Sequence, residues 1–254
     1  MASLDHQPPK RLAILVSLPQ NTTHEGQSGI NILYTGISRQ AYCDLDPDSQ
    51  NPDNQEVYQH FRSVVGAVLL AFNPLSMESF ILLQGFDTLS DISTVLNPLH
   101  SIFLVPEITK DPVRTFLMDP KRYKDVQFFV DPTIHHTEIL LSCLQLMEQT
   151  LRRNICDLDG IPLDKVDDLS DCRKEHIRDA LEYACQSRTK HLMKSPSSGP
   201  SAKKAQEKID KFFAMHLLHW IELLTIMEKL DASVYSLNDI KQWYTLVSLG
   251  ISLT

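Results

Sequence analysis

Breaks in the apolar stretch of residues 58–105 constrain the fold more than any other feature of this sequence. A first helical pattern ends at Asn73-Pro74, because the residue before a proline avoids helical backbone angles. A second, shorter pattern follows Ser76, a candidate N-cap, and ends at Gly85, a candidate C-terminal glycine. A third pattern is expected to begin with Ser90 as its cap. The sequence therefore predicts three helices in close succession.

The residues after these helices have the pattern of a β-hairpin. Residues 102–105 and 113–117 are two short apolar runs, and the polar, proline-containing segment 106–112 between them is typical of a turn. Three helices followed by a hairpin is the order of a winged-helix module. The predicted fold class is mainly α, with a winged-helix module that carries a short β-hairpin, followed by an α-helical domain.

The C-terminal half is predicted to be helical. Amphipathic patterns, with apolar residues three and four positions apart, cover residues 135–152, 173–192, 208–230 and 231–247. Segment 194–204 is rich in serine, proline and lysine and is expected to be a flexible linker. The predicted domains are a tail at residues 1–55, a winged-helix domain at 56–131 and a helical domain at 132–254.

Composition and charge narrow the possible functions. With 43% hydrophobic residues among 254, the chain can bury a sizeable core, and wholesale disorder is not expected. The formal net charge is -8, so the chain is not expected to have the basic surface that gives most nucleic-acid affinity or attraction to anionic lipid. No apolar run approaches the roughly 20 residues needed to span a bilayer. The apolar run 12–18 is too short for a secretory signal and is ended by Pro19.

The cysteines indicate a reducing compartment. Their number is odd and none lies in a C-x-x-C pair, which is typical of free, mostly buried thiols in a cytoplasmic protein. The five are Cys43, Cys143, Cys156, Cys172 and Cys185.

No group of residues predicts a catalytic, cofactor-binding or metal site. His135, His136 and Glu138 resemble a metal-binding group, but adjacent histidines on a helix point apart, so we expect them to be solvated or capping at a helix start. His216 and His219 lack a third ligand and are expected to be core histidines satisfied by hydrogen bonds. The glycines of segment 26–29 lack the lysine of a phosphate-binding loop.

The third predicted helix argues against DNA reading. Residues 91–97 contain Asp91 and no lysine or arginine, so the phosphate contacts that anchor such a helix are missing. A winged helix that packs against protein is the favoured interpretation. The basic tract 190–204 is expected to be a solvated surface rather than a nucleic-acid site.

The chain resembles fungal NACHT-type STAND NTPases, the NOD-like receptors with WD-type repeats, over residues 11–244. The segments that carry the resemblance are 33–42, 61–70, 74–76, 96–101, 128–132, 143–147, 153–157, 180–185 and 218–222. In that family the matching region follows the nucleotide-binding core. The resemblance implies the end of a first helical domain within residues 1–55, then a winged-helix domain and a second helical domain. Together they would relay ligand sensing to the ATPase.

Several departures from the family pattern limit this implication. The phosphate-binding loop, the acidic Mg²⁺-binding motif and the repeats are absent from the chain. In the family, the segment that ends the wing carries a histidine that is expected to face the nucleotide. In this chain that segment is shorter: residues 115–119 follow Arg114, and several residues, including the histidine, are missing. Cofactors and ATP binding are therefore not expected. Arg188 lies on the apolar stripe of residues 177–192, so that helix is expected to pack less tightly.

The leading hypothesis is a non-enzymatic regulatory segment of a NACHT-type STAND NTPase, truncated and acting through protein–protein contacts. Its partner would be a full-length related receptor or a second copy of the chain, with no membrane and no nucleic acid. The alternatives are a DNA-binding winged-helix protein, a hydrolase that uses a cysteine or histidine, and a gene remnant without selected function.

Overall fold

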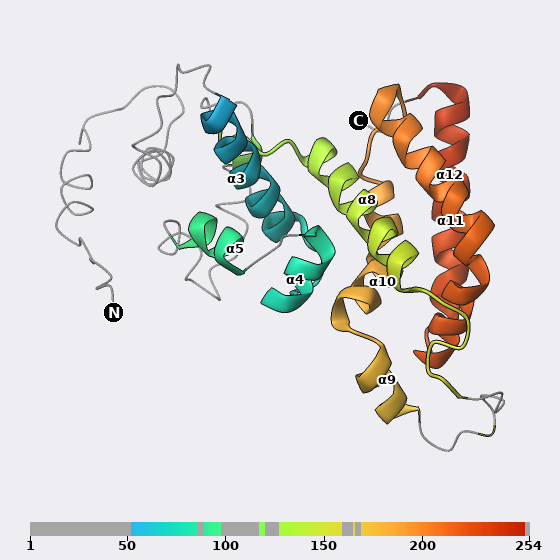
Figure 1. Ribbon diagram of the computed structural model, residues 1–254. Helices are drawn as coiled ribbons and strands as arrows, with labels where there is room; N and C mark the ends of the chain where they lie inside the picture. Colours follow the sequence, from blue (N-terminus) through green and yellow to red (C-terminus); the bar gives the residue numbers. More distant parts are fainter. Residues whose placement is uncertain are drawn as a thin grey trace, which may run out of the picture. The chain divides into compact units, whose positions relative to one another are not determined.

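The computed structural model describes the protein at residues 52–85, 89–97, 117–119, 127–158, 165 and 169–251. Within these residues the fold is mainly α, and no strand occurs among them (Figure 1). The expected hairpin at residues 102–117 lies almost entirely outside the described residues, as does the N-terminal tail. The chain divides into two compact units, residues 1–69 with 92–131 and residues 70–91 with 132–254.

The first unit is built on helix α3 (Pro52–Leu70) and most of α5 (Leu89–Leu96). The apolar positions in the middle of this helix form its core-facing side, since Phe61, Val64 and Val65 are fully buried, whereas Val57 near its start and Phe72 after its end are exposed. Phe128 packs edge-on against Phe61 and Tyr58, with ring centroids 5.0 and 5.1 Å apart. Burial of these aromatic side chains fixes segment 127–130 against one face of α3.

Helix α4 (Met77–Gln84) begins and ends where the sequence predicts. The Ser76 hydroxyl accepts a hydrogen bond from the backbone N–H of Ser79 at 3.2 Å, as an N-cap does. Gly85 ends the helix in the left-handed conformation at φ 70°, and its N–H donates to the Ile81 carbonyl. The predicted cap of the next helix is wrong, because α5 already begins at Leu89 and Ser90 lies in its first turn.

The second unit holds α4 and the C-terminal helices. These are α8 (Pro132–Thr150), α9 (Ser170–His176), α10 (Asp179–Leu192), α11 (Gly199–Ile226) and α12 (Asp231–Leu249). Helix α10 packs against α8, α12 and α4, and α11 packs against α8 and α12 (Figure 1). The core of this unit therefore lies between α8, α10 and the α11–α12 pair.

The single helix expected over residues 173–192 is in fact two. Ile177 and Arg178 adopt extended backbone angles between α9 and α10. Basic side chains occupy the last turn of α9, whereas Asp179 and Glu182 lie in the first turn of α10. Basic side chains stabilise the C-terminal end of a helix and acidic ones the N-terminal end, through the helix dipole. The two sets of charges therefore favour the end of one helix and the start of another at this point.

The flexible linker expected at residues 194–204 is also corrected. Helix α11 begins at Gly199, with Pro200 in its first turn, where a proline costs no hydrogen bond. Ala202 and Ala205 are buried and continue the apolar stripe of α11 toward Ile209. The composition resembles a linker, but these small residues pack as part of a helix.

Arg188 does not loosen the helix that carries it. Its side chain is buried, with the guanidinium carbon 4.1 Å from the centre of the Trp220 ring and 4.9 Å from that of Phe212. Nη1 donates to the carbonyl of Cys185 at 2.7 Å, while Nη2 has no hydrogen-bond partner among the described residues. Burial lowers the pKa of Arg188 to about 10, so the group stays charged at neutral pH. The cation is held by aromatic faces in place of a carboxylate.

This arrangement predicts the effect of removing the charge. Arg188→Met keeps much of the volume and removes the cost of burying a cation, so the free energy of unfolding should stay unchanged or rise by up to about 2 kcal/mol. Urea unfolding followed by circular dichroism measures this difference. Exposed Arg178 is the matched control, and Arg178→Met should change little. A loss of more than about 2 kcal/mol for Arg188→Met would show that the cation itself stabilises the core.

Candidate functional site: a cysteine–histidine cluster

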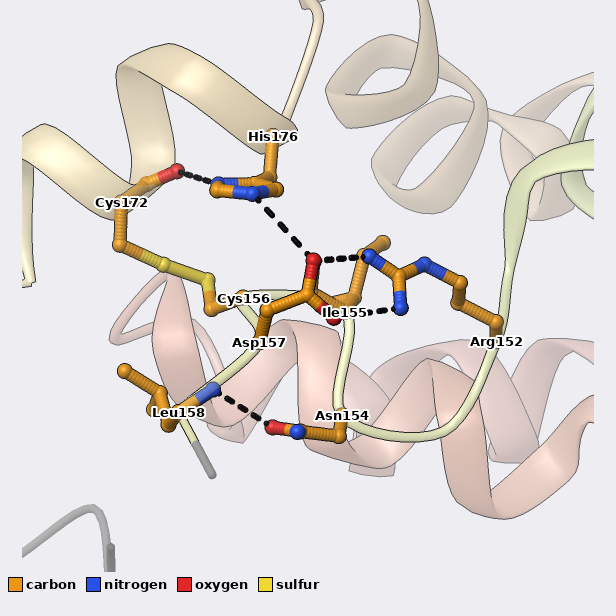
Figure 2. Close-up of a disulfide and its surroundings, with 8 residues drawn as sticks. All are labelled: Arg152, Asn154, Ile155, Cys156, Asp157, Leu158, Cys172 and His176. Atoms are coloured by element: carbon orange, nitrogen blue, oxygen red, sulfur yellow. Dashed lines mark hydrogen bonds and ion pairs between the residues drawn. A yellow bond between two sulfur atoms is a disulfide. The ribbon is translucent and has the colours of Figure 1, made fainter. Parts of the chain in front are cut away.

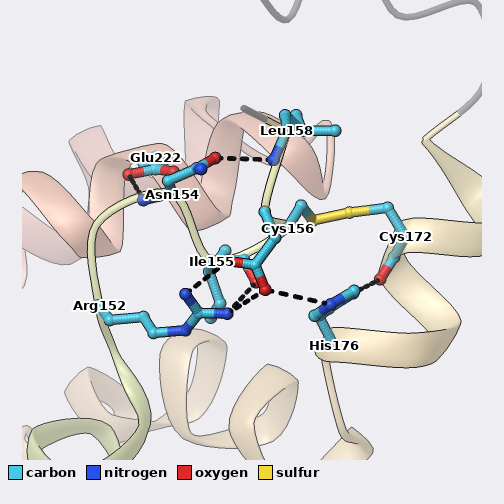
Figure 3. Close-up of polar contacts among 9 residues, drawn as sticks. Arg152, Asn154, Ile155, Cys156, Leu158, Cys172, His176 and Glu222 are labelled. Atoms are coloured by element: carbon cyan, nitrogen blue, oxygen red, sulfur yellow. Dashed lines mark hydrogen bonds and ion pairs between the residues drawn. A yellow bond between two sulfur atoms is a disulfide. The ribbon is translucent and has the colours of Figure 1, made fainter. Parts of the chain in front are cut away.

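The loop after α8 brings several polar side chains together. Asn154 and Asp157 both have positive φ angles, 55° and 49°, a conformation that asparagine and aspartate tolerate better than most residues. The Asn154 side chain accepts a hydrogen bond from the Leu158 N–H at 3.0 Å. Its backbone N–H donates to Glu222 of α11 at 3.3 Å (Figure 3). The loop is therefore held in a defined shape against α11.

A disulfide joins this loop to α9. Cys156 and Cys172 are bonded, with their Cα atoms 5.6 Å apart (Figure 2). The expectation that these two thiols are free is wrong, because the fold brings together residues that are 16 positions apart and share no sequence motif. Cys143 and Cys185 are free and buried, as predicted. Cys43 lies outside the described residues.

His176 lies one helical turn after Cys172 on the same face of α9. Its Nδ1 is 3.2 Å from the backbone carbonyl of Cys172, and its Nε2 is 3.6 Å from Oδ2 of Asp157 (Figure 2). A carbonyl can only accept, so Nδ1 carries a hydrogen, and Nε2 is the ring nitrogen that faces Asp157. Potential ligand atoms of Cys156, Cys172 and His176 all lie within 4.8 Å of one another.

Asp157 forms a bidentate salt bridge with Arg152. The two guanidinium nitrogens lie 2.7 and 2.6 Å from Oδ1 and Oδ2 of the carboxylate (Figure 2). These hydrogen bonds hold the pKa of Asp157 below its usual value, so the carboxylate is ionised at neutral pH. Both side chains are about half exposed. The cluster is thus open to solvent on its Asp157 side.

This cluster was missed by sequence reasoning. Two sulfurs and an imidazole are the ligand types of a zinc or redox site. The available signal was the i, i+4 spacing of Cys172 and His176 on one helix, which places both side chains on one face. Nothing in the sequence indicates that Cys156 joins them, because that depends on how the loop after α8 packs.

His135 and His136 are buried, which corrects the expectation that they are solvated. Nδ1 of His135 lies 2.7 Å from Glu138, whereas Nδ1 of His136 lies 2.8 Å from Nδ1 of His191 on α10. The adjacent histidines have different partners, in keeping with the expectation that they point apart. The first turn of α8 is largely exposed, and burial begins at His135 and His136, where His191 of α10 contacts His136.

His191 is the centre of a buried polar network. Its Nε2 lies 2.8 Å from the hydroxyl of Tyr183, which in turn accepts from the N–H of Phe72 at 3.4 Å. The Phe72 ring stacks on His136 and meets His191 edge-on. Burial, together with smaller effects of the nearby His136 and Lys190, lowers the pKa of His191 to about 3. The imidazole is therefore neutral at physiological pH.

The free cysteines have the environment of inert thiols. Burial raises the pKa of Cys143, and it raises the pKa of Cys185 to about 12. A nucleophilic cysteine needs a thiolate near neutral pH, and burial in the core opposes its formation here. The interpretation as a cysteine hydrolase gains no support from these two residues.

His216 and His219 do not form a site either. Their rings meet edge to face with centroids 5.6 Å apart, and His216 stacks on Phe212. The expected hydrogen bonds are not seen, since neither Nδ1 has a partner within the described part of the chain. Both rings act as aromatic packing residues on α11.

No protein-family model, no curated protein and no solved structure matches this chain. The resemblance to STAND NTPases therefore stays a prediction from the quoted segments. None of the helices described here is long and apolar enough to cross a membrane.

The low pKa of His191 predicts a pH-dependent stability. The unfolded state takes up a proton near pH 6.5 and the folded state only near pH 3, so stability should fall as the pH drops through this window. Between pH 6.5 and 5 the loss should be about 1–2 kcal/mol. Chemical unfolding at a series of pH values measures the slope.

The control for this slope is His191→Gln, whose amide oxygen can still accept from Tyr183. This variant should be less stable at pH 7 but should lose less stability on acidification. Identical slopes for the two proteins would show that another group is responsible.

Proposed function

We propose that this chain is a non-enzymatic regulatory segment of a NACHT-type STAND NTPase that acts through protein–protein contacts. The observation that carries the proposal is an exposed apolar face on α11. Met215 and Leu218 are 63% and 76% exposed there. The other face of the same helix buries Trp220 and Leu223 completely.

The exposed face extends beyond two side chains. Exposed Ala214 and half-buried Leu217 and Ile221 lie within one turn of Leu218, so they add to the same apolar surface. Helix α12, which packs against α11, exposes further large apolar residues, among them Val234 and Tyr235. Single exposed leucines are ordinary, but a group of this kind is typical of a surface that contacts another protein.

The charge of the chain supports a protein partner over a nucleic acid. With a net charge of -8 it lacks the excess of cations over acidic residues that favours binding to phosphate groups. The segment of α5 has the sequence LSDISTVL, with an aspartate and no lysine or arginine. The partner proposed is a related full-length receptor or a second copy of this chain.

The central test replaces Leu218 by glutamate. A charge at the centre of an apolar contact should weaken binding at least tenfold, because the carboxylate must be desolvated. Sedimentation velocity at micromolar concentrations measures self-association, and surface plasmon resonance with a purified fungal NACHT-type receptor measures binding to a relative. Leu249→Glu is the matched control, since Leu249 is also exposed but ends α12.

Several outcomes would contradict this function. One is a wild-type protein that neither self-associates nor binds the receptor. Another is association that Leu218→Glu and Leu249→Glu weaken equally. Turnover of ATP above a no-protein control would reject the non-enzymatic assignment. Salt-dependent binding to duplex DNA would favour the winged-helix alternative.

A further inference from the structure

We propose that, once the Cys156–Cys172 cross-link is reduced, the two thiolates bind a zinc ion together with His176 and Asp157. The disulfide is then the oxidised, metal-free state of the same site. The proposal goes beyond the protein-contact function and does not depend on it.

The cluster is compact enough to form a tetrahedral zinc site once the bond between the sulfurs is broken. Zinc–sulfur bonds of about 2.3 Å and zinc–nitrogen bonds of about 2.0 Å place ligand atoms about 3.3–3.8 Å apart. The atoms of Cys156, Cys172 and His176 lie within 4.8 Å of one another. The 3.6 Å between His176 Nε2 and Asp157 Oδ2 is already close to the required separation.

The hydrogen bonds around His176 prepare its ring for a metal. Nδ1–H donates to the Cys172 carbonyl, which leaves Nε2 beside a carboxylate oxygen. A metal ion near these two atoms could accept electron pairs from both of them. A ligand histidine whose other nitrogen donates to a carbonyl is the usual arrangement around zinc.

Asp157 lies beside His176 but outside the compact group of the other three ligand atoms, so a small movement toward the sulfurs would make it the fourth ligand. Arg152 takes up one hydrogen-bonding position on each carboxylate oxygen, and each oxygen has a second lone pair. The loop fixes the direction of this side chain through the positive φ of Asp157. Two thiolates, one imidazole and one carboxylate favour zinc over calcium or magnesium, which prefer oxygen ligands.

Helix α9 has the freedom that the change of state requires. It has no buried residue, so the sulfurs can move apart without opening a core. A thiol reductant, with two R–SH groups, transfers two electrons and two protons to the disulfide and leaves as R–S–S–R. Zinc then displaces the two thiol protons and forms two Zn–S bonds.

The experiment uses the full chain with Cys43→Ser, so that the remaining thiols are the cluster pair and the two buried cysteines. The protein is reduced with a phosphine, and zinc is titrated against a chromophoric chelator. Cobalt(II) then serves as a spectroscopic probe of thiolate ligation and tetrahedral geometry. We expect one metal per chain, a sulfur-to-cobalt charge-transfer band that Cys172→Ser reduces by half or more, and no stoichiometric binding by the oxidised protein.

Milder variants keep the test valid if a cysteine variant fails to fold. His176→Gln and Asp157→Asn should each weaken zinc binding ten- to a hundredfold. Glu175→Gln is the matched control, because this exposed residue precedes His176 and should leave the affinity unchanged. A reduced protein that stays helical by circular dichroism but binds no zinc at micromolar concentration would overturn the site. Equal binding by the wild type and His176→Gln would do so as well.

Discussion

Helix α10 is buried on almost every side, and the second unit is organised around this burial. Ten of its fourteen residues are buried, from Ala180 to Leu192. It packs against α8 on one side and against α12 and α4 on others. A helix in this position cannot send its buried polar side chains into water, so they depend on contacts within the core.

The partners found explain the unusual chemistry of this core. Arg188 keeps its charge because burial lowers its pKa only to about 10, and Trp220 and Phe212 offer the cation aromatic faces. His191 stays neutral because burial disfavours its protonated form. Tyr183 links His191 to the backbone of Phe72, which ties the segment before α4 to α10. These polar groups position neighbouring elements relative to one another. Their pKa values are shifted because packing buries them, and not because a catalytic role requires the shift.

The sequence predicts those features whose cause is local. Ser76 and Gly85 act within a few residues of their own positions, and both were identified correctly. The burial of His136, the helical state of residues 199–204 and the bond between Cys156 and Cys172 were missed. Each depends on a helix distant in sequence that covers the residue or approaches it. The break between α9 and α10 at Ile177 was also missed, although its cause is local: the change from basic to acidic residues around Ile177 is visible in the sequence.

The cysteine–histidine cluster and the exposed face of α11 are physically connected. Glu222, which accepts the hydrogen bond from Asn154, lies one helical turn after Leu218. The same loop carries Cys156, whose bond to Cys172 holds α9, a helix without buried residues of its own. Since α9 has little core packing, its attachment depends on the chemical state of this cluster more than on hydrophobic burial. A change at the sulfurs would therefore act first on α9 and on the loop that Asn154 joins to Glu222 of α11.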